Sequence, residues 1–271
     1  MNVITAIVEL SRASRRVLRR HPLLAWFPIL SLFALVAIFA FVGPILDDEP
    51  RWLAILGLLF IAHLVHVFFS VALTHEALKA LRGDAPSVTS GLATATSRVP
   101  SILAFAAVTS TFGFLLALLG RSRSIAVQIA RAVIGTAWSL ATYLAIPVMV
   151  QERRGGVPSL RRSGMLFRRT WGETALSEVG IRVLTARIAI VLVIVALVLV
   201  KLLADSLFAL LLAMVLSIAV IGVIGALEAI YRAALYVFAS EGVVPEPFGG
   251  PELDAIWHAK PADPPAPESN V

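Results

Sequence analysis

The sequence of 271 residues contains no cysteine. This absence excludes disulfide bonds, thiolate metal sites, iron–sulfur clusters and cysteine nucleophiles together. A chain without cysteine is compatible with both oxidising and reducing surroundings, so the redox compartment stays open.

Motifs of the common soluble enzymes are also missing. The chain has no G-x-x-x-x-G-K-[ST] phosphate loop, no H-E-x-x-H zinc motif, no G-x-S-x-G nucleophile elbow, no G-x-G-x-x-G dinucleotide loop and no D-x-x-D carboxylate cluster. Its acidic residues lie mostly in turns and in the C-terminal tail, where solvation explains them. We therefore predict that the protein is not an enzyme and that it has no catalytic residues, no cofactor and no metal site.

Charged residues are scarce, whereas apolar residues are plentiful. Charged side chains make up 15% of the chain and hydrophobic ones 59%, and the mean hydropathy is +0.90. A soluble domain of this composition would expose too much apolar surface to water, so the sequence predicts an integral membrane protein. Basic residues outnumber acidic ones by 23 to 17, but they cluster beside apolar runs, which argues against nucleic acid as a partner.

Six apolar runs are long enough to cross a hydrocarbon core of roughly 30 Å as helices. The sequence thus predicts an all-α fold, a polytopic membrane bundle of six transmembrane helices with amphipathic helices on the cytoplasmic surface. A basic segment (1–22) precedes the membrane domain (23–240), residues 74–82 extend the second span into water, and a proline-rich tail (241–271) is too polar to bury a core. The predicted spans are 23–46, 52–73, 99–120, 125–150, 183–200 and 207–239.

The distribution of basic residues predicts which way the chain faces. When both termini and the second and fourth loops are placed in the cytoplasm, 18 basic residues lie on that side and 4 on the other, with Arg131 left inside a span. Cytoplasmic loops of membrane proteins carry an excess of Lys and Arg, so this asymmetry is a strong orientation signal. We expect a multi-pass protein of the cell (plasma) membrane with cytoplasmic N- and C-termini.

A basic loop precedes the fifth predicted span. From Ser159 to Thr174 apolar residues recur at three- and four-residue spacing, which predicts an amphipathic helix with Phe167 and Trp171 on its apolar side. Its cationic side suits an anionic leaflet, where each arginine contributes about 1 kcal/mol, while the aromatic side would be buried at the lipid boundary. In the alternative, the arginines only orient the chain and the segment docks on other helices or forms a coil. The candidate contacts to anionic lipid are Arg161, Arg162, Arg168 and Arg169.

Ionisable residues within the spans are further candidates, because a charge at membrane depth costs at least about 2.5 kcal/mol. Arg131 lies about two turns inside the fourth span, from where it could also reach back to the external surface. His63 and His66 share a face of the second span, but without a nearby carboxylate they make a poor metal site, and we expect interior hydrogen bonds. Glu228 and Arg232, four residues apart, are expected to form an ion pair.

Several short segments stand out against the apolar background. They are R-R-H-P-L-L at 19–24 with Phe27 and Pro28, G-T-A-W-S-L-A-T at 135–142, I-P-V at 146–148 with Glu152, Arg162 and Ser163 with Phe167, T-W-G-E at 170–173, and Y-R-A-A-L-Y at 231–236. Together they resemble a family of prokaryotic multi-span membrane proteins catalogued as a domain of unknown function, number six-one-five-nine. The resemblance extends to about Lys260; it implies the six-helix architecture and supplies no activity.

Three classes of function follow from these observations. The first is a non-enzymatic membrane component that acts at the cytoplasmic leaflet through the basic loop and the tail. The second is a small transporter or lipid-handling channel, in which Arg131, His63 and His66 line a path and Pro28 and Pro147 break the spans. The third and least favoured is an intramembrane enzyme. A packed apolar bundle would favour the first class, a polar cavity at membrane depth the second, and a nucleophile beside a base the third; protein partners and oligomeric state stay open.

Overall fold

The structure is a computed structural model that describes residues 3–42, 52–171, 207–249 and 257. Every regular element in these ranges is a helix and none is a strand, which confirms the predicted all-α class. The elements are α1 (Val3–Arg20), η1 (Pro22–Ala25), α2 (Trp26–Val42), α3 (Trp52–Leu81), α4 (Val88–Ser97), α5 (Val99–Leu119), α6 (Ile125–Tyr143), α7 (Ala145–Gln151), α8 (Gly156–Trp171), α10 (Leu207–Glu241) and η3 (Glu246–Phe248), where η marks a 3-10 helix.

Within the described ranges, five helical stretches are long and apolar enough to cross a membrane. They correspond to five of the six predicted spans, while the predicted span at 183–200 lies outside the described residues. Large apolar side chains on these helices face outward, which suits a hydrocarbon environment and supports the membrane class. The stretches are Pro22–Val42, Trp52–Leu81, Val99–Leu119, Ile125–Gln151 and Gly222–Glu241.

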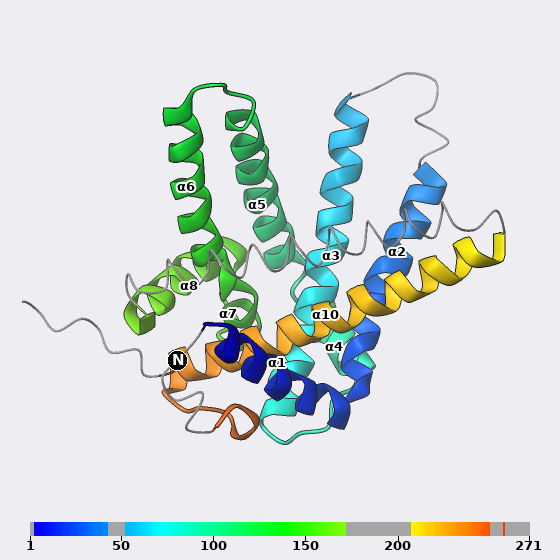
Figure 1. The fold of residues 1–271 in the computed structure, drawn as a ribbon, viewed down its shortest axis with the longest axis vertical. Coiled ribbons are helices and arrows are strands. Elements are labelled where there is room, and N and C mark those ends of the chain that lie inside the picture. Colours follow the sequence, from blue (N-terminus) through cyan, green and yellow to red (C-terminus); the bar gives the residue numbers. More distant parts are fainter. Residues whose placement is uncertain (1–2, 43–51, 172–206, 250–256, 258–271) are drawn as a thin grey trace, which may run out of the picture.

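The helices occupy two levels (Figure 1). α2, α3, α5 and α6 stand upright, and α1, α4, α7 and α8 gather around their lower ends. The buried hydrophobic core lies at this lower level, which we call the base, where the C-terminal half of α3 meets α4, α7 and the C-terminal half of α10, and where α8 packs on α7. Large side chains that are fully buried in it include Leu24, Phe27, Leu78, Met149 and Ile230.

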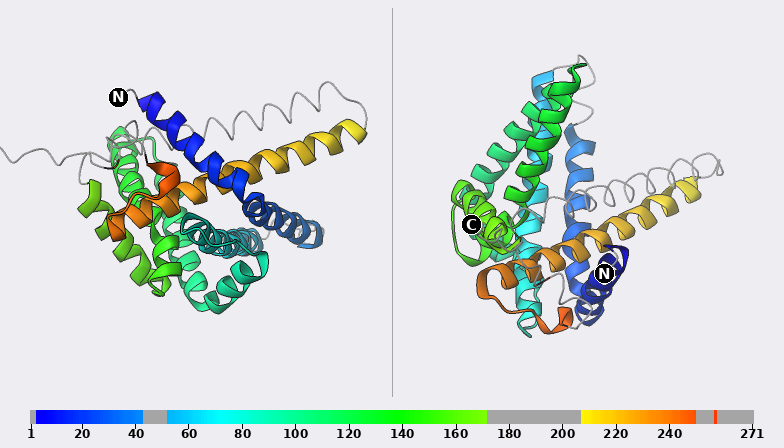
Figure 2. Two further views of the ribbon diagram at one scale, coloured as in Figure 1. Left: turned by 90° about the horizontal axis from the view of Figure 1, so that it is seen from below. Right: turned by 60° about the vertical axis from the view of Figure 1, so that its left-hand side comes forward.

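α10 crosses the upright helices obliquely instead of running alongside them, as both Figure 1 and Figure 2 show. Two glycines allow the crossing to be close. A Cβ atom added to Gly222 would lie 3.0 Å from Cγ1 of Ile29, and one added to Gly225 would lie 3.5 Å from the Pro28 ring. Small residues at a helix crossing let the backbones approach, and this approach lets α10 pack against α2.

The two prolines expected to break spans lie near helix starts. Pro28 falls in the first turn of α2, where little helical hydrogen bonding is lost, and the bend in the chain is made by η1 just before it. The fourth predicted span is divided at Leu144, which separates α6 from α7, and Pro147 lies in the first turn of α7. The N–H of Leu144 donates to Oγ of Ser163 over 3.0 Å, so α8 supports this break.

Part of the proline-rich tail is built into the base. The prediction that residues 241–271 bury no core is wrong for Phe248 and Trp257, which are both buried. Nε1–H of Trp257 donates to the Phe248 carbonyl over 3.2 Å, and the Arg16 guanidinium donates to the Pro247 carbonyl over 2.7 Å. Two aromatic residues among many prolines change the composition little, so composition alone did not reveal this contact.

Candidate functional site

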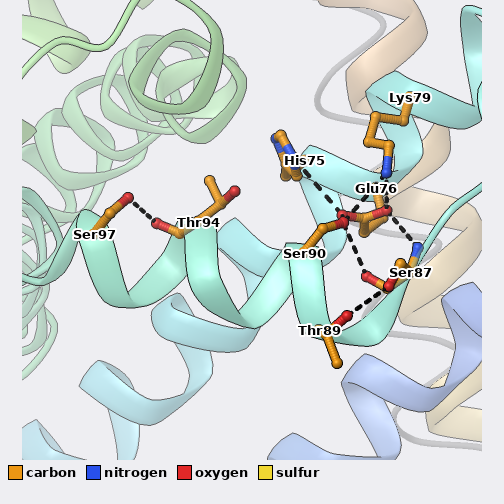
Figure 3. A network of polar contacts seen from close by, with 8 residues as sticks. All are labelled: His75, Glu76, Lys79, Ser87, Thr89, Ser90, Thr94 and Ser97. Atoms are coloured by element: carbon orange, nitrogen blue, oxygen red, sulfur yellow. Dashed lines mark hydrogen bonds and ion pairs between the residues drawn. The ribbon is translucent and has the colours of Figure 1, made fainter.

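Glu76, in the C-terminal half of α3, is fully buried, and no other carboxylate or basic side chain in the described ranges is. Figure 3 shows its carboxylate facing the start of α4. Oε2 accepts hydrogen bonds from the N–H of Ser87 at 2.7 Å and forms an ion pair with Nζ of Lys79 at 3.2 Å. Oε1 accepts from the hydroxyl of Ser90 and lies 3.7 Å from Nε2 of His75.

This arrangement anchors one helix on another. Ser87 occupies the N-cap position of α4, yet its side chain makes no capping bond and instead contacts the Thr89 hydroxyl at 2.8 Å. From α3, Glu76 accepts from the Ser87 N–H, and a carboxylate at a helix N-terminus is also favoured by the helix dipole. We conclude that Glu76 fixes the α3–α4 corner.

The same cluster places a serine beside a lysine, which is one arrangement of hydrolase nucleophiles. Nζ of Lys79 lies 3.2 Å from Oγ of Ser90. However, Lys79 is already in an ion pair with Glu76, and the Ser90 hydroxyl donates its proton to the same carboxylate. A lysine engaged in this way is not a free base, so the geometry describes a structural clamp.

The sequence did not point to Glu76, because residues 74–82 were expected to extend into water. The only local signal is the three-residue spacing between Glu76 and Lys79 on one helix face. The partners Ser87 and Ser90 lie beyond a turn, and only the packing of α4 against α3 brings them within reach.

The two candidate histidines on α3 meet different partners. Nε2 of His63 is hydrogen-bonded to Oγ1 of Thr109 on α5 at 2.8 Å, which confirms the expected interior hydrogen bond for that residue. His66 interacts electrostatically with Glu228 and Arg232 of α10. Among the described residues, no group of three His, Cys, Asp or Glu side chains is arranged to hold a metal ion.

The predicted ion pair between Glu228 and Arg232 is confirmed. Cζ of Arg232 also lies 4.9 Å from the centre of the Tyr143 ring at the end of α6, a distance suited to a cation–π contact. α3, α6 and α10 thus bring His66, Tyr143, Glu228 and Arg232 together at one point. The opposite charges compensate one another, and this group fastens the oblique α10 to the upright helices.

Arg131 lies on α6, and its guanidinium group reaches Gly120 at the C-terminal end of α5. A Cβ atom added to Gly120 would lie 2.9 Å from Cζ of Arg131, and the Gln128 amide donates to the carbonyls of Gly120 at 3.2 Å and Ser122 at 2.7 Å. A cation is favoured at a helix C-terminus, so Arg131 snorkels to the end of α5. Thr109, the hydrogen-bond partner of His63, lies eleven residues before Gly120 on α5, about 16 Å along the helix. Arg131 and His63 are therefore not brought together.

The basic loop forms α8, and its apolar face is covered by protein. Phe167 is buried, with ring centres 6.4 Å from Tyr143 and 5.0 Å from Trp171. The expectation that Phe167 lies at the lipid boundary is therefore wrong. At the start of α8, a Cβ atom added to Gly156 would lie 2.4 Å from the Ser101 carbonyl oxygen, so the approach to α5 requires glycine here.

The four candidate arginines of α8 divide into two groups. Arg162 is half-buried and donates to Glu152 over 3.0 Å, and Arg154 donates to the same carboxylate over 2.7 Å. Partial burial acts to raise the pKa of Glu152, but the hydrogen bonds and charges of these two arginines outweigh it and hold the pKa below its ordinary value. The exposed group is Arg161, Arg168 and Arg169.

α1 presents a second basic face. Its inner positions are buried against α10 and η3, and its outer positions recur at three- and four-residue spacing. The sequence predicted only an orienting role for this segment. The exposed outer residues are Arg12, Arg15, Arg16, Arg19 and Arg20.

Taken together, these features describe an all-helical protein with five helical stretches able to cross a membrane and with basic helices around the base. Residues 51–245 match the model of a family described as "Family of unknown function (DUF6159)", and the chain belongs to this family. The match confirms the family that the sequence resembles. No curated protein and no solved structure matches the chain.

Proposed function

We propose that the protein is a non-enzymatic membrane component that acts at the cytoplasmic leaflet, where α8 binds the headgroups of anionic lipids. The observation that supports this is the exposure of Arg161, Arg168 and Arg169 on a helix whose apolar face is fixed on α5, α6 and α7. A docked helix holds its cations in place without inserting into the bilayer. Each arginine near an anionic surface contributes about 1 kcal/mol, so the three together give substantial attraction.

The proposal places the base, with both termini, in the cytoplasm of a cell whose plasma membrane holds the spans. The 18-to-4 distribution of basic residues supports this orientation. The cysteine-free chain allows a direct test with single cysteines at the exposed positions Ser124 and Ser97. In intact cells an impermeant maleimide should label Ser124→Cys and should reach Ser97→Cys only after permeabilisation. The reverse pattern would rule the orientation out.

Lipid binding is tested with matched pairs of arginines at opposite ends of the molecule. The variant R168Q/R169Q changes α8, and the control R121Q/R123Q changes exposed arginines at the α5–α6 turn. The full chain is purified in mild detergent with phosphatidylglycerol and phosphatidylcholine, and retained lipids are identified by native mass spectrometry. We expect R168Q/R169Q to retain less phosphatidylglycerol than the parent and the control to match the parent. An unchanged lipid complement in R168Q/R169Q would defeat the proposal.

A small transporter or lipid-handling channel is the second candidate. It is favoured by one observation, which is that Glu228 keeps 48% of its side chain exposed although it lies in a membrane-spanning stretch beside Arg232. A polar path would use this exposed carboxylate, so Glu228→Gln should abolish any ion or lipid flux measured in proteoliposomes. No flux by the parent protein would remove this candidate.

A further inference from the structure

We propose that α1 forms a second binding site for anionic lipid headgroups, made by Arg15, Arg19 and Arg20 where the chain enters its first span. The proposal rests on the cytoplasmic orientation of the proposed function but uses different residues. Its ligand chemistry is the phosphodiester of an anionic lipid.

The way α1 is packed leaves only its cationic side available. The opposite side is buried against α10 and η3, and it is held there by the hydrogen bond from Arg16 to the Pro247 carbonyl. An amphipathic helix normally binds membranes by inserting its apolar face. Because protein already occupies that face of α1, the helix offers lipid a row of fixed guanidinium groups. The buried side consists of Leu10, Ala13, Ser14, Val17 and Leu18.

Two of the five exposed arginines of α1 are already engaged within the protein. Arg12 forms an ion pair with Glu9 one turn earlier, and Arg16 donates to the tail. In the described part of the chain, no carboxylate lies within ion-pair distance of Arg15, Arg19 or Arg20. With no carboxylate partner among the described residues, these three exposed arginines can meet an external anion.

The position of this row identifies the external anion. α1 ends at Arg20, and η1 leads directly to Trp26 at the start of α2, where the Trp26 side chain is 56% exposed. Exposed tryptophan at the start of a span is typical of the membrane–water interface. Arg19 and Arg20 are therefore at headgroup depth, within about two helical turns of the hydrocarbon edge.

The chemistry of arginine then selects phosphate. A guanidinium group donates two parallel hydrogen bonds to phosphate oxygens, which an ammonium group cannot do in the same way. In zwitterionic lipids the choline cation compensates the phosphate, whereas anionic lipids leave a net negative charge for the arginine row. We expect binding to phosphatidylglycerol and much weaker binding to phosphatidylcholine.

The test uses the full chain with a single fluorescent label at Ser11→Cys, next to the row, titrated in detergent with short-chain phosphatidylglycerol. Each arginine replaced should weaken binding about fivefold, so R15Q/R19Q/R20Q should raise the Kd about a hundredfold. The control R121Q/R123Q, outside both proposed lipid sites, should leave this Kd unchanged, and because the label reports on α1 alone, failure of one lipid site does not imply failure of the other. A parental Kd in R15Q/R19Q/R20Q would overturn the proposal.

Two further measurements keep the test decisive if the glutamine variant does not fold. R15K/R19K/R20K keeps the positive charge that orients the chain, and it should bind within about fivefold to tenfold of the parent. The parent is also titrated with short-chain phosphatidylcholine and with inorganic phosphate, and neither should reproduce the response at equal concentration. Equal responses to phosphatidylglycerol and phosphatidylcholine, or to inorganic phosphate, would overturn the lipid site.

Discussion

The two ends of α3 differ in what surrounds them. At its start, Trp52 and Leu53 each expose 66% of their surface, whereas Val71 and Ala77 in its second half are fully buried among α4, α7 and α10. One continuous helix thus passes from exposed apolar side chains into a packed core. The upright helices as a group follow this pattern, with exposed apolar side chains above and the core in the base.

The difference shows where the fold is held together. In the base, burial of apolar surface from water and close packing stabilise the arrangement. Between apolar helices in lipid, the hydrophobic effect supplies no comparable drive, because lipid tails are as apolar as leucine. Substitutions in the base should therefore cost far more stability than chemically matched substitutions in the upper parts of the spans.

The largest loss of folding stability is expected from Phe248→Ala. This side chain is fully buried between α1 and the tail, and truncation of a buried phenylalanine costs about 3–5 kcal/mol. The matched control is Phe41→Ala on α2, where the side chain is 80% exposed. Thermal unfolding in detergent should show a large loss for Phe248→Ala and almost none for the control. Similar losses in both would remove the distinction between base and spans.

A smaller loss of folding stability is expected from Glu76→Ala. The change removes the charged acceptor at the start of α4 and leaves Lys79 without its partner, which should cost about 2–3 kcal/mol. Asp84→Ala, at an exposed position of the same α3–α4 connection, is the control and should be close to neutral. Hydrogen exchange should show faster exchange in α4 for Glu76→Ala only. Unchanged protection of α4 would mean that Glu76 does not anchor that helix.

The next smaller loss of stability is expected from Gly156→Ala, which should lower the free energy of unfolding by about 1–3 kcal/mol. The new Cβ atom would meet the Ser101 carbonyl oxygen and the Phe105 backbone nitrogen at 2.4 and 2.5 Å, and backbone atoms cannot move aside easily. Gly113→Ala on α5 meets nothing within 4 Å and should be neutral or stabilising by up to about 1 kcal/mol. Denaturation in detergent compares the two variants, and a harmless Gly156→Ala would contradict the close contact of α8 with α5.

The smallest effect concerns pH. The pKa of Glu152 is lower in the folded protein than its ordinary value, so the ionised carboxylate stabilises the fold above that ordinary value, and this contribution is lost as the pH falls through the lowered pKa. Both arginine partners are partly exposed, which limits the effect to at most about 1 kcal/mol.

Melting temperatures of the parent and of Glu152→Gln, measured from neutral to acidic pH, check this expectation. The parent should be the more stable at neutral pH, and the difference should disappear in acid. A difference that persists below the lowered pKa would show that the Glu152 contacts stabilise α8 by packing and not by charge.

Local patterns predicted much of the fold. The apolar runs predicted the described spans, because a helix satisfies its own backbone hydrogen bonds and the number of consecutive apolar residues gives its length. The spacing of Glu228 and Arg232 predicted their ion pair for the same reason, since residues four apart share a helix face. The prediction that Phe167 lies at the lipid boundary failed, because periodicity identifies an apolar face but not whether lipid or protein covers it.

By itself, then, the sequence determined the all-α class, the apolar spans, the asymmetry of basic residues and the short-range ion pairs. Only the tertiary structure decided that His63 meets Thr109 across 46 residues, that Ser90 reaches Glu76 across 14, and that Arg16 reaches Pro247 across 231. The physical reason is the range of the interactions. Hydropathy and helix periodicity act between near neighbours, whereas these contacts depend on how α3, α4, α5, α1 and the tail pack, which no local spacing encodes.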